Sequence, residues 1–385
     1  MKIQVAKQDL MEALSVALTS MHGSGADLST HCLFRPSEDD PSRAEVLTYS
    51  PRCFSKCPFV ADVDVSSGHE AFTIEGKRLR RWVDAVPDVA LTFEFDGTSV
   101  KATAPGRGTQ KFQSLDPDNW PYWDSLVQEA KAPISIGASR LASALDHCRQ
   151  FASDQESRSP EMCVCEVKDG VLASTNKIAA SLITVEGLAE STMRIHAKDT
   201  PGILSFLATI QGDVEVLEGD SNIFFRRADG TIYGESRFQA QFPGFSRPDN
   251  SDMHWWDLKV EDLKSGIPFL TSGAAWEDNR LCFIRDGKDG PVTIAMMTTS
   301  GSMTSVEVEC VESGKIDGVE PLPEEGFVLA YPLLSKVLSL YGGDVIRLGL
   351  TSLERGGYVR IMEKKFQNKD GSGGDTYLTI LVWLR

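Results

Sequence analysis

The feature that most constrains the fold is a pattern that occurs three times along the chain. Apolar residues at spacings of three and four are typical of an amphipathic helix, and three segments show them. The segments are KQDLMEALSVAL (7–18), SRLASALDHCRQFA (139–152) and EDLKSGIPFLTSG (261–273). The third contains Gly266 and Pro268, so its helix is predicted to be short or kinked. A chain that repeats itself in this way should fold as a series of similar units.

A second helical pattern follows each of these segments and leads into strands. The second patterns span 77–86, 201–210 and 331–341. The strands predicted after them are 89–95, 213–220 and 344–350, each followed by a turn and a further strand at 98–104, 222–227 and 357–362. Val89, Val214 and Val345 occupy equivalent places, 125 and 131 residues apart. Alternation of apolar and polar residues in these strands predicts antiparallel sheets with one buried face.

Aromatic residues around a proline mark the ends of the first two repeats. WPYW (120–123) and FPGF (242–245) share this pattern, and the polar linkers VQEAKAP (127–133) and RPDNSDMH (247–254) follow them. The boundaries predict three domains, at 1–128, 129–250 and 251–385. The predicted fold class is α+β, with two helices on antiparallel sheet in each domain.

Composition places the chain among cytoplasmic globular proteins. It has 385 residues, of which 41% are hydrophobic and 24% charged, enough for two or three domains. The first residues turn polar at once, and no apolar stretch reaches the roughly 20 residues of a membrane span. The eight cysteines are expected to be reduced thiols, because neither Cys53 with Cys57 nor Cys163 with Cys165 has the second pair that a structural zinc site needs. No cofactor or metal is predicted.

The distribution of charge leaves two interpretations open. The net charge of −16 argues against nucleic acid, whose partners carry a basic surface. However, GKRLRR (76–81) places four basic residues in five positions. In an amphipathic helix, Lys77, Arg78 and Arg81 would lie on or near the side opposite to the apolar stripe. This side is either a solvated helix face or a surface for nucleic acid.

The three repeats together resemble the bacterial DNA polymerase III beta subunit, the DNA sliding clamp. MKIQVAKQDLMEAL resembles the first strand and helix of that family, and the block from Met193 to Pro248 resembles its middle domain. The stretch from GFVLAYPLLSKVLSLYGGDVIRLGL to TYLTILVWLR resembles its last domain. The likeness covers essentially the whole chain in the right order, although residues 22–70 match poorly and indicate a divergent or viral member.

The resemblance implies an assembly and a function. In this family two protomers of three domains join head to tail into a closed ring, with the helices around the hole and the sheets outside. The chain is therefore expected to be a homodimeric processivity factor. It would encircle double-stranded DNA without sequence preference and tether the DNA polymerase and the clamp loader through a peptide-binding pocket.

The resemblance further implies that basic side chains on the inward helices face the DNA, as a diffuse positive potential without base readout. A loop at 154–160 matches a DNA-contacting loop of the family, but Ser159 and Pro160 replace two tyrosines of the family pattern. The predicted DNA-binding residues are Lys7, Lys77, Arg78, Arg80, Arg81, Arg140, Arg149, Gln155, Arg158, Lys198, Lys259, Lys264 and Lys336.

A pocket for the short peptide tails of polymerases and clamp loaders is also implied. Such a receptor should be an apolar cleft with a polar rim. The matching residues are Ser174, Thr175, Lys177, Ile178, Pro243, Phe245, Arg247, Leu333, Leu353, Leu381, Val382, Trp383 and Leu384. For each apolar member, a place in the core is the alternative. The family pattern has a proline and methionines near the C-terminal end that are absent here, which leaves the preferred peptide open.

Closure of the ring needs edge strands that pair across protomers. The predicted edge strand QKFQS (110–114) would meet the end of the 261–273 helix of the other protomer, around Leu270 to Trp276, with Phe112 as the apolar anchor. Covering an edge strand in a symmetric dimer also removes a surface that would otherwise aggregate.

Two other classes of function compete with a clamp. The motifs GxxxxGKS/T, GxSxG, HExxH and GxGxxG do not occur, and the six histidines are scattered, so catalysis is not predicted. The second alternative is a clamp-like interaction module that does not encircle DNA. The acidic balance and the departure at Ser159 and Pro160 favour it, and a monomeric native mass would support it.

Overall fold

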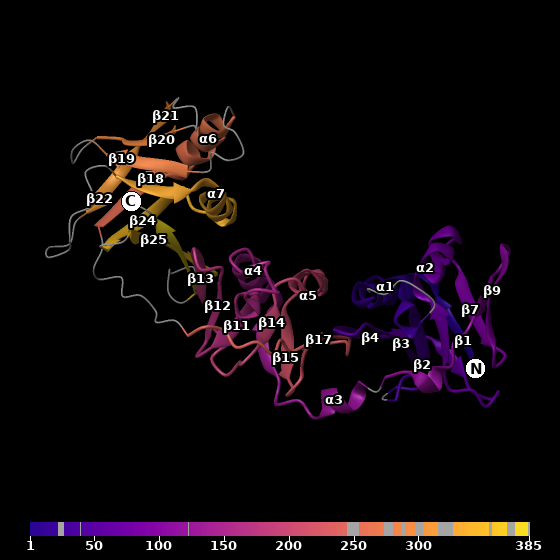
Figure 1. Ribbon diagram of the computed structural model, residues 1–385. Coiled ribbons are helices and arrows are strands. Elements are labelled where there is room, and N and C mark those ends of the chain that lie inside the picture. Colours follow the sequence, from indigo (N-terminus) through magenta and orange to yellow (C-terminus); the bar gives the residue numbers. More distant parts are fainter. Residues whose placement is uncertain are drawn as a thin grey trace. The chain divides into compact units, whose positions relative to one another are not determined.

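The chain divides into two compact units (Figure 1). The first unit comprises residues 1–142 and 190–238, and the second comprises 143–189 and 239–385. The predicted middle domain contributes to both units, and the predicted boundaries at residues 128 and 250 stay a prediction. The computed structural model describes residues 1–21, 27–38, 40–121, 123–244, 254–272, 280–285, 290–297, 303–314, 326–353, 356–367 and 374–383.

The six predicted helices are confirmed, with ends that differ by a few residues at most. Among the described residues, five of these six helices begin at the residue directly after a strand. A short further helix, α3 (Asp124–Gln128), precedes and overlaps the predicted linker. No helix among the described residues is long and apolar enough to cross a membrane. The six are α1 (Lys7–Ala17), α2 (Gly76–Ala85), α4 (Ala138–Arg149), α5 (Thr200–Leu207), α6 (Val260–Thr271) and α7 (Tyr331–Leu340).

Helix α6 was expected to be short or kinked; it is not short, and the kink stays a prediction. It runs for 12 residues with Pro268 inside it. A Cβ added at Gly266 would lie 3.0 Å from Cγ2 of Val306, so the glycine allows the helix to approach that strand residue closely. The Thr271 hydroxyl lies 3.1 Å from the Ile267 carbonyl, to which it donates a hydrogen bond in the last turn. Ile267 is buried in the core, and this packing outweighs the low helix propensity of glycine and proline.

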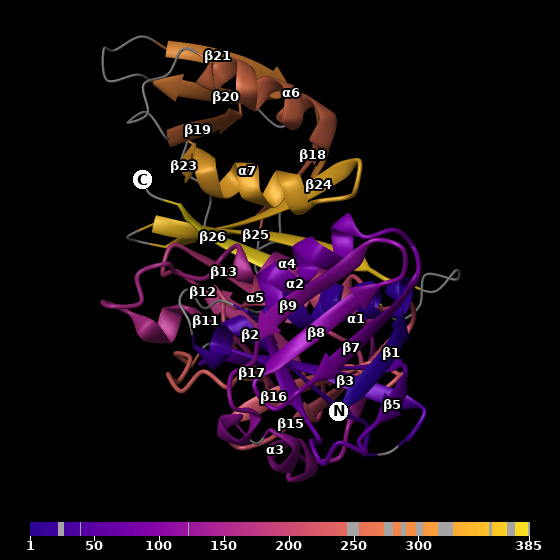
Figure 2. The same ribbon diagram turned by 90° about the vertical axis from the view of Figure 1, so that its right-hand side faces the viewer.

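Two antiparallel sheets form the first unit. The pairing order β5-β1-β7-β8-β9 leaves β9 at one edge of a five-stranded sheet (Figure 2). These strands are β5 (Asp62–Asp64), β1 (Lys2–Ala6), β7 (Ala90–Phe95), β8 (Ser99–Ala104) and β9 (Gly108–Gln113). The eight-stranded sheet consists, in order, of β10 (Ile134–Gly137), β15 (Asp213–Glu218), β16 (Asn222–Arg226), β17 (Ile232–Ser236), β4 (Cys53–Val60), β3 (Arg43–Tyr49), β2 (His31–Pro36) and β6 (Phe72–Glu75).

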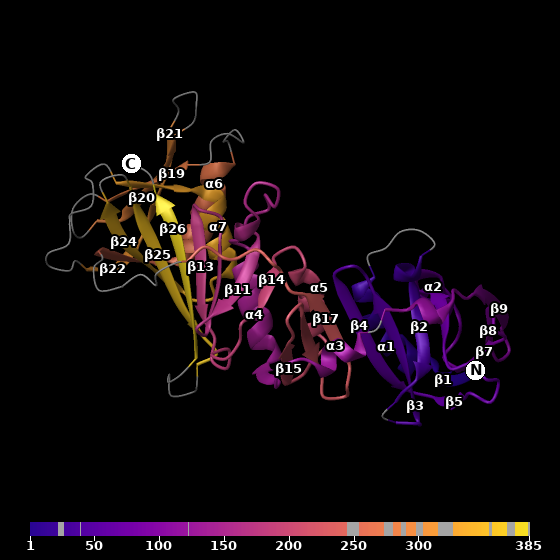
Figure 3. The same cartoon turned by 60° about the horizontal axis from the view of Figure 1, so that its bottom comes forward.

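The second unit also contains two sheets, and α6 and α7 lie together beside them (Figures 1 and 3). The longer sheet runs in the order β11 (Val164–Lys168), β12 (Val171–Thr175), β13 (Ala179–Thr184), β26 (Asp375–Trp383), β25 (Gly356–Lys365), β24 (Val345–Leu353), β18 (His254–Lys259) and β22 (Cys310–Gly314). The four-stranded sheet is β21 (Met303–Val308), β20 (Val292–Met297), β19 (Arg280–Arg285) and β23 (Phe327–Ala330), with β21 at an edge (Figure 2). A short strand, β14 (Arg194–His196), precedes α5.

Two strand pairings join segments that are far apart in the sequence. In the first unit β17 pairs antiparallel with β4, and in the second unit β13 pairs antiparallel with β26 (Figure 3). Each pairing continues a sheet from one predicted domain into the next. The strands of neighbouring repeats therefore form continuous sheets instead of meeting only through side chains.

The aromatic motifs at the ends of the repeats cover these continuous sheets. Trp123 stacks on Phe54 of β4 at 5.0 Å between ring centroids, and Trp120 meets Tyr49 edge-on at the same distance. Phe242 packs against buried Ala173, Leu182 and Leu378 in the second unit. The repeated motif thus anchors the segment that leads out of each of the first two repeats.

The two faces of β2 separate two layers of the first unit. Phe34 stacks against Phe93 of β7, and Trp82 of α2 meets that same ring edge-on. Leu33, the next residue along the strand, packs instead with Trp120 on the opposite face. The helix α2 and the segment after β9 therefore lie on opposite faces of this sheet.

A buried carboxyl group lies at the β17–β4 pairing. Glu235 is 1% exposed, and its Oε2 accepts a hydrogen bond from the Tyr233 hydroxyl at 3.2 Å. Its Oε1 has no hydrogen-bond partner among the described residues. Burial, followed by the negative charge of Asp199, raises the pKa of Glu235 from the usual 4.5 to about 8.

This raised pKa predicts how stability depends on pH. The folded chain keeps the proton up to about pH 8, whereas the unfolded chain releases it near pH 4.5. Because the folded state binds more protons between these values, the free energy of unfolding should fall as pH rises through that window, by up to about 1.4 kcal/mol per unit. Glu235→Gln should flatten this dependence, measured as urea midpoints between about pH 5 and about pH 7.5. Glu129→Gln, at an exposed position, is the control, and an unchanged slope in Glu235→Gln would assign the proton to another group.

Candidate nucleic-acid interface and peptide site

Helix α2 presents its basic residues to solvent, as its pattern predicts. Leu79 and Val83 are fully buried, whereas Lys77, Arg78 and Arg81 are exposed. The Arg81 guanidinium donates to the Lys77 carbonyl at 3.3 Å, and Arg78 lies 3.9 Å from Glu75. Contacts this weak at exposed positions leave the three cations able to meet an anionic partner.

Several other predicted DNA-binding residues already have partners within the chain. Arg80 pairs with Asp84 at 3.0 Å and Arg149 with Asp146 at 2.6 Å. Lys259 pairs with Glu309. Arg140 is half-exposed and Lys198 exposed. The ammonium groups of three lysines donate to backbone carbonyls near helix ends: Lys7 to Val86 at 2.6 Å, Lys264 to Tyr341 at 3.5 Å and Lys336 to Gln150 at 3.3 Å.

These partners give three of the predicted DNA-binding lysines a structural role, and their contact with DNA stays a prediction. A lysine that satisfies the last carbonyls of a helix has a structural role, because those carbonyls have no partner within the helix itself. These hydrogen bonds therefore explain why a lysine stands at positions 7, 264 and 336 without any contact to DNA. Lys77, Arg78 and Arg81 are the most closely spaced exposed members of the predicted set.

The loop after α4 lies beside the predicted peptide site. Gln155 and Arg158 are exposed in this loop. Ser159 in this loop departs from the family pattern. The Lys177 ammonium donates a hydrogen bond to the Ser159 hydroxyl at 3.3 Å. Lys177 has a φ of 78° in the turn between β12 and β13. The two predicted sites are thus adjacent in the second unit.

The β12–β13 turn brings part of the predicted peptide site together. The Asn176 side chain accepts hydrogen bonds from the backbone of Ile178 and Ala179, at 3.2 and 2.8 Å. This turn leaves Ile178 53% exposed, a high value for such an apolar side chain. The backbone N–H of Val382 donates to the Ile178 carbonyl at 3.0 Å, so the end of β26 lies directly beside the turn.

Three predicted members of the peptide site are corrected by their burial. Leu333 and Leu381 are 7% and 0% exposed and belong to the core of the second unit. Ser174 is fully buried, and its hydroxyl donates to the Cys148 carbonyl near the end of α4. These side chains support the site from beneath and do not form its surface.

The remaining predicted members are placed only in part. Thr175 is half-buried, and its hydroxyl donates to the Ala179 carbonyl at 2.7 Å; Pro243 is also half-buried. Phe245, Arg247 and Leu384 lie outside the described residues, as do the side chains of Leu353 and Trp383. Asn176, whose side chain shapes the turn, was not among the predicted site residues. An Asn-Lys dipeptide between two strand patterns could have indicated a turn at this place.

The edges of two sheets correct the predicted interface residues. β9 is an edge strand, as predicted, but Phe112 is 2% exposed and packs edge-on against Trp82 of α2. Leu270 is 3% exposed in the core of the second unit, and Trp276 lies outside the described residues. The exposed apolar residue of α6 is its neighbour Phe269, at 60%.

The exposed residue Phe269 could have been found from the pattern. It lies off the stripe of Leu263, Ile267 and Leu270, so helical geometry turns it outward when that stripe faces the core. Met303, 68% exposed on the edge strand β21, carries no comparable signal, because only the pairing of the strands shows that β21 is an edge.

The chemistry of these surfaces is that of binding. Among the described residues, no group of three or more histidine, cysteine, aspartate or glutamate side chains is placed to hold a metal ion. Exposed cations on a helix, an exposed isoleucine on a turn and unpaired strand edges can hold a polyanion, a peptide or another chain.

Comparison with known proteins relates the fold to solved structures. No protein-family model and no curated protein matches the chain. The DNA polymerase III subunit beta from Pseudomonas aeruginosa matches at a TM-score of 0.80 and 14% identity, over 100% of both chains. The sliding clamp from Caulobacter crescentus matches at 0.79 and 15%, and that from Bartonella birtlesii, bound to griselimycin, at 0.77 and 14%, each over 100% of both chains. The chain therefore has the mixed helix-and-sheet fold of bacterial sliding clamps.

Proposed function

We propose that this chain is a sliding clamp of the DNA polymerase III beta family, a processivity factor that encircles duplex DNA. The observation that carries the proposal is the pattern of strand pairing. Two continuous sheets, at β17–β4 and β13–β26, join successive repeats within the chain. Among the described strands, β9 in the first repeat and β21 in the third are each at the edge of a sheet, as are β5, β6, β22 and β23. A head-to-tail dimer in which β9 of one protomer pairs with β21 of the other would complete the same kind of junction twice and close a ring.

The chemistry of the two edges supports this pairing. β9 carries Lys111, with Arg107 just before it, whereas β21 carries Glu307. Opposite charges across an interface favour the correct partner and orientation. Phe269 of α6 adds the exposed apolar surface that an interface core needs.

The native mass tests this assembly. We expect the chain to sediment as two protomers, and Phe269→Asp to raise the dissociation constant of the dimer by at least about thirtyfold, the effect of a hot-spot residue. Val60→Asp is the matched control, because Val60 is 59% exposed at the end of another strand, β4. A parent chain that stays monomeric at all concentrations would instead favour a clamp-like interaction module without a ring.

In the proposed ring the helices would face the DNA. The exposed cations of α2 provide a local positive surface on a chain whose net charge is −16. Contacts to phosphates of this kind are independent of sequence and allow sliding. The role is mechanical, and it requires no chemistry from the protein itself.

A peptide-binding site would tether partner proteins to the ring. The exposed Ile178 beside the end of β26 supports this part of the proposal, together with Lys177 at its rim. The clamp from Bartonella birtlesii is bound to griselimycin, which makes ligand binding by proteins of this fold an observed property. By analogy, polymerase and clamp-loader tails with apolar residues are the expected ligands here.

Ile178 should be essential for this binding. Ile178→Asp places a carboxylate where an apolar side chain of the peptide would pack, so we expect affinity for an apolar polymerase-tail peptide to fall at least about tenfold. Fluorescence anisotropy with a labelled peptide measures the effect. Met362→Asp, at an exposed position on β25 (45%), should leave affinity unchanged. Equal effects of both variants would mean that the peptide binds elsewhere.

A further inference from the structure

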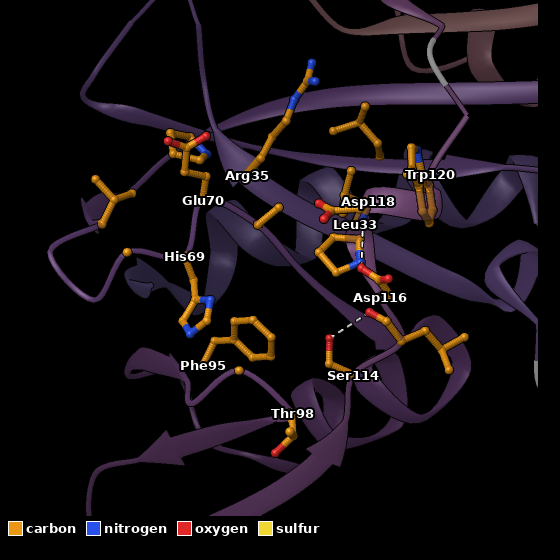
Figure 4. A pocket seen from close by; sticks show the side chains of 18 of the residues that line it. Leu33, Arg35, His69, Glu70, Phe95, Thr98, Ser114, Asp116, Asp118 and Trp120 are labelled. Atoms are coloured by element: carbon orange, nitrogen blue, oxygen red, sulfur yellow. Dashed lines mark hydrogen bonds between the residues drawn. The ribbon is translucent and has the colours of Figure 1, made fainter.

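A cavity in the first unit is separate from the basic face of α2 and from the peptide site, and Gln113 at the end of β9 is part of its lining. Its volume is about 970 Å³, which falls within the range typical of ligand sites. Figure 4 shows His69 and Phe95 on one side and Trp120 on the other. The walls come from β2 and β3, from residues 65–71, from the β7–β8 turn and from the segment 113–121 after β9.

The cavity opens on the face of the sheet that α2 does not cover. Leu33 and Leu47 line it, and they are paired neighbours on β2 and β3. They face away from Phe34, whose side of the sheet carries α2. An occupant of the cavity would therefore not compete with a ligand of the basic helix.

The lining combines apolar and acidic groups. Leu33 and Leu47 are buried in the floor and Phe95 is buried at one side, whereas Val65 is 44% exposed at the margin. Four exposed carboxylates surround this apolar surface, and they belong to Glu38, Glu70, Asp116 and Asp118.

The one arginine of the lining balances only one of these carboxylates, because its Nη1 lies 3.8 Å from Oε1 of Glu38. The Arg35 guanidinium donates from Nε to Oε2 of Glu45 at 3.0 Å, and its Nη2 lies 3.0 Å from the same oxygen. Glu45 is 1% exposed and also lies 3.4 Å from Nζ of Lys56, so the charges of Arg35 and Lys56 offset those of Glu45 and Glu38. The carboxylates of Glu70, Asp116 and Asp118 are left to set the charge of the rim. His69 packs edge-on against Phe95 at 5.0 Å. The rim of the cavity therefore carries net negative charge.

We propose that this cavity binds a short peptide segment of a partner protein, one that places a large apolar side chain next to lysine or arginine. The apolar floor would receive the apolar side chain, and the carboxylates would pair with the cation. Nucleic acid is excluded by the same carboxylates. A site of this kind would give the protein a second docking surface, selective for basic peptides, in the first unit.

The test uses the full chain and a fluorescein-labelled peptide of alternating lysine and leucine. We expect saturable binding that weakens with added salt, and that is lost when serine replaces the leucines or glutamate replaces the lysines. Glu70→Lys combined with Asp118→Lys should weaken binding at least about tenfold. Asp88→Lys combined with Glu129→Lys changes the net charge equally at exposed positions outside the cavity and should have little effect.

Further variants distinguish binding in this cavity from binding elsewhere on the chain. Equal weakening by both double variants would mean that the peptide responds only to the overall negative charge of the chain. This result would overturn the proposal. Loss of binding in Ile178→Asp would place the peptide in the second unit, and this would also overturn it. Val65→Ser, which keeps all charges, should weaken binding through the apolar contact alone. The result does not depend on ring formation, because the cavity lies within one unit of a single chain.

Discussion

Protein loaded onto nicked circular DNA should remain bound through a wash at about 1 M salt, where the Debye length of about 3 Å removes most electrostatic attraction. It should leave when a restriction enzyme linearises the circle. A closed ring is held by topology, so the strength of its contacts with phosphates matters little while both the ring and the circle stay closed. Gel filtration of the labelled protein with the DNA before and after cleavage measures the release.

The control for retention is the interface variant Phe269→Asp. A protein that cannot close its ring should dissociate from circular and linear DNA alike in the same wash. Salt-sensitive loss from intact circles, with no effect of linearisation, would show ordinary surface binding and would contradict encirclement.

Replacing Lys77, Arg78 and Arg81 together with serine should strongly weaken direct binding to duplex DNA. Each phosphate contact contributes about one unit to the slope of log affinity against log salt, so removal of the three cations should lower that slope by about three. Extrapolated from about 1 M to about 0.1 M salt, this corresponds to an affinity loss of roughly 500-fold. Titration of labelled duplex DNA at several salt concentrations measures the slope.

The matched control for the α2 variant removes the same charge elsewhere. Lys101, Lys131 and Lys168 are exposed at other places, and their replacement with serine should leave the slope nearly unchanged. Dimer mass and peptide binding should stay as in the parent for both triple variants. If the α2 variant keeps the parental slope, its basic face is only solvated surface.

The six helices could be predicted from the repeat, together with the two strands that follow the second helix of each repeat. The apolar stripe of α2 requires Leu79 and Val83 to face the sheet, and they are fully buried. One expectation differed in part at α6, where Gly266 and Pro268 predicted a short or kinked helix and the helix runs for 12 residues. Local propensity costs about 1 kcal/mol for glycine and about 3 for proline, which burial of several apolar side chains can exceed. Burial of that kind is a property of the folded chain that local sequence does not reveal.

The individual site residues were less predictable than the elements that carry them. The type of a basic or apolar residue does not show which group it will contact in the folded chain. Lys7 donates to a carbonyl at the end of α2, 79 residues away, and the Ser174 hydroxyl donates to the Cys148 carbonyl. Phe112 fills the space beside Trp82, although its strand is an edge.

The sequence by itself indicated the six helices, the two strands after the second helix of each repeat, and the polarity of the helix faces, because these depend on periodicities of two and 3.6 residues along the chain. Only the tertiary structure decided which strand edges remain open, which cations stay exposed and where a cavity forms. Those properties depend on contacts between residues far apart in the sequence. At the β17–β4 and β13–β26 pairings, such contacts use backbone hydrogen bonds that every residue except proline can make.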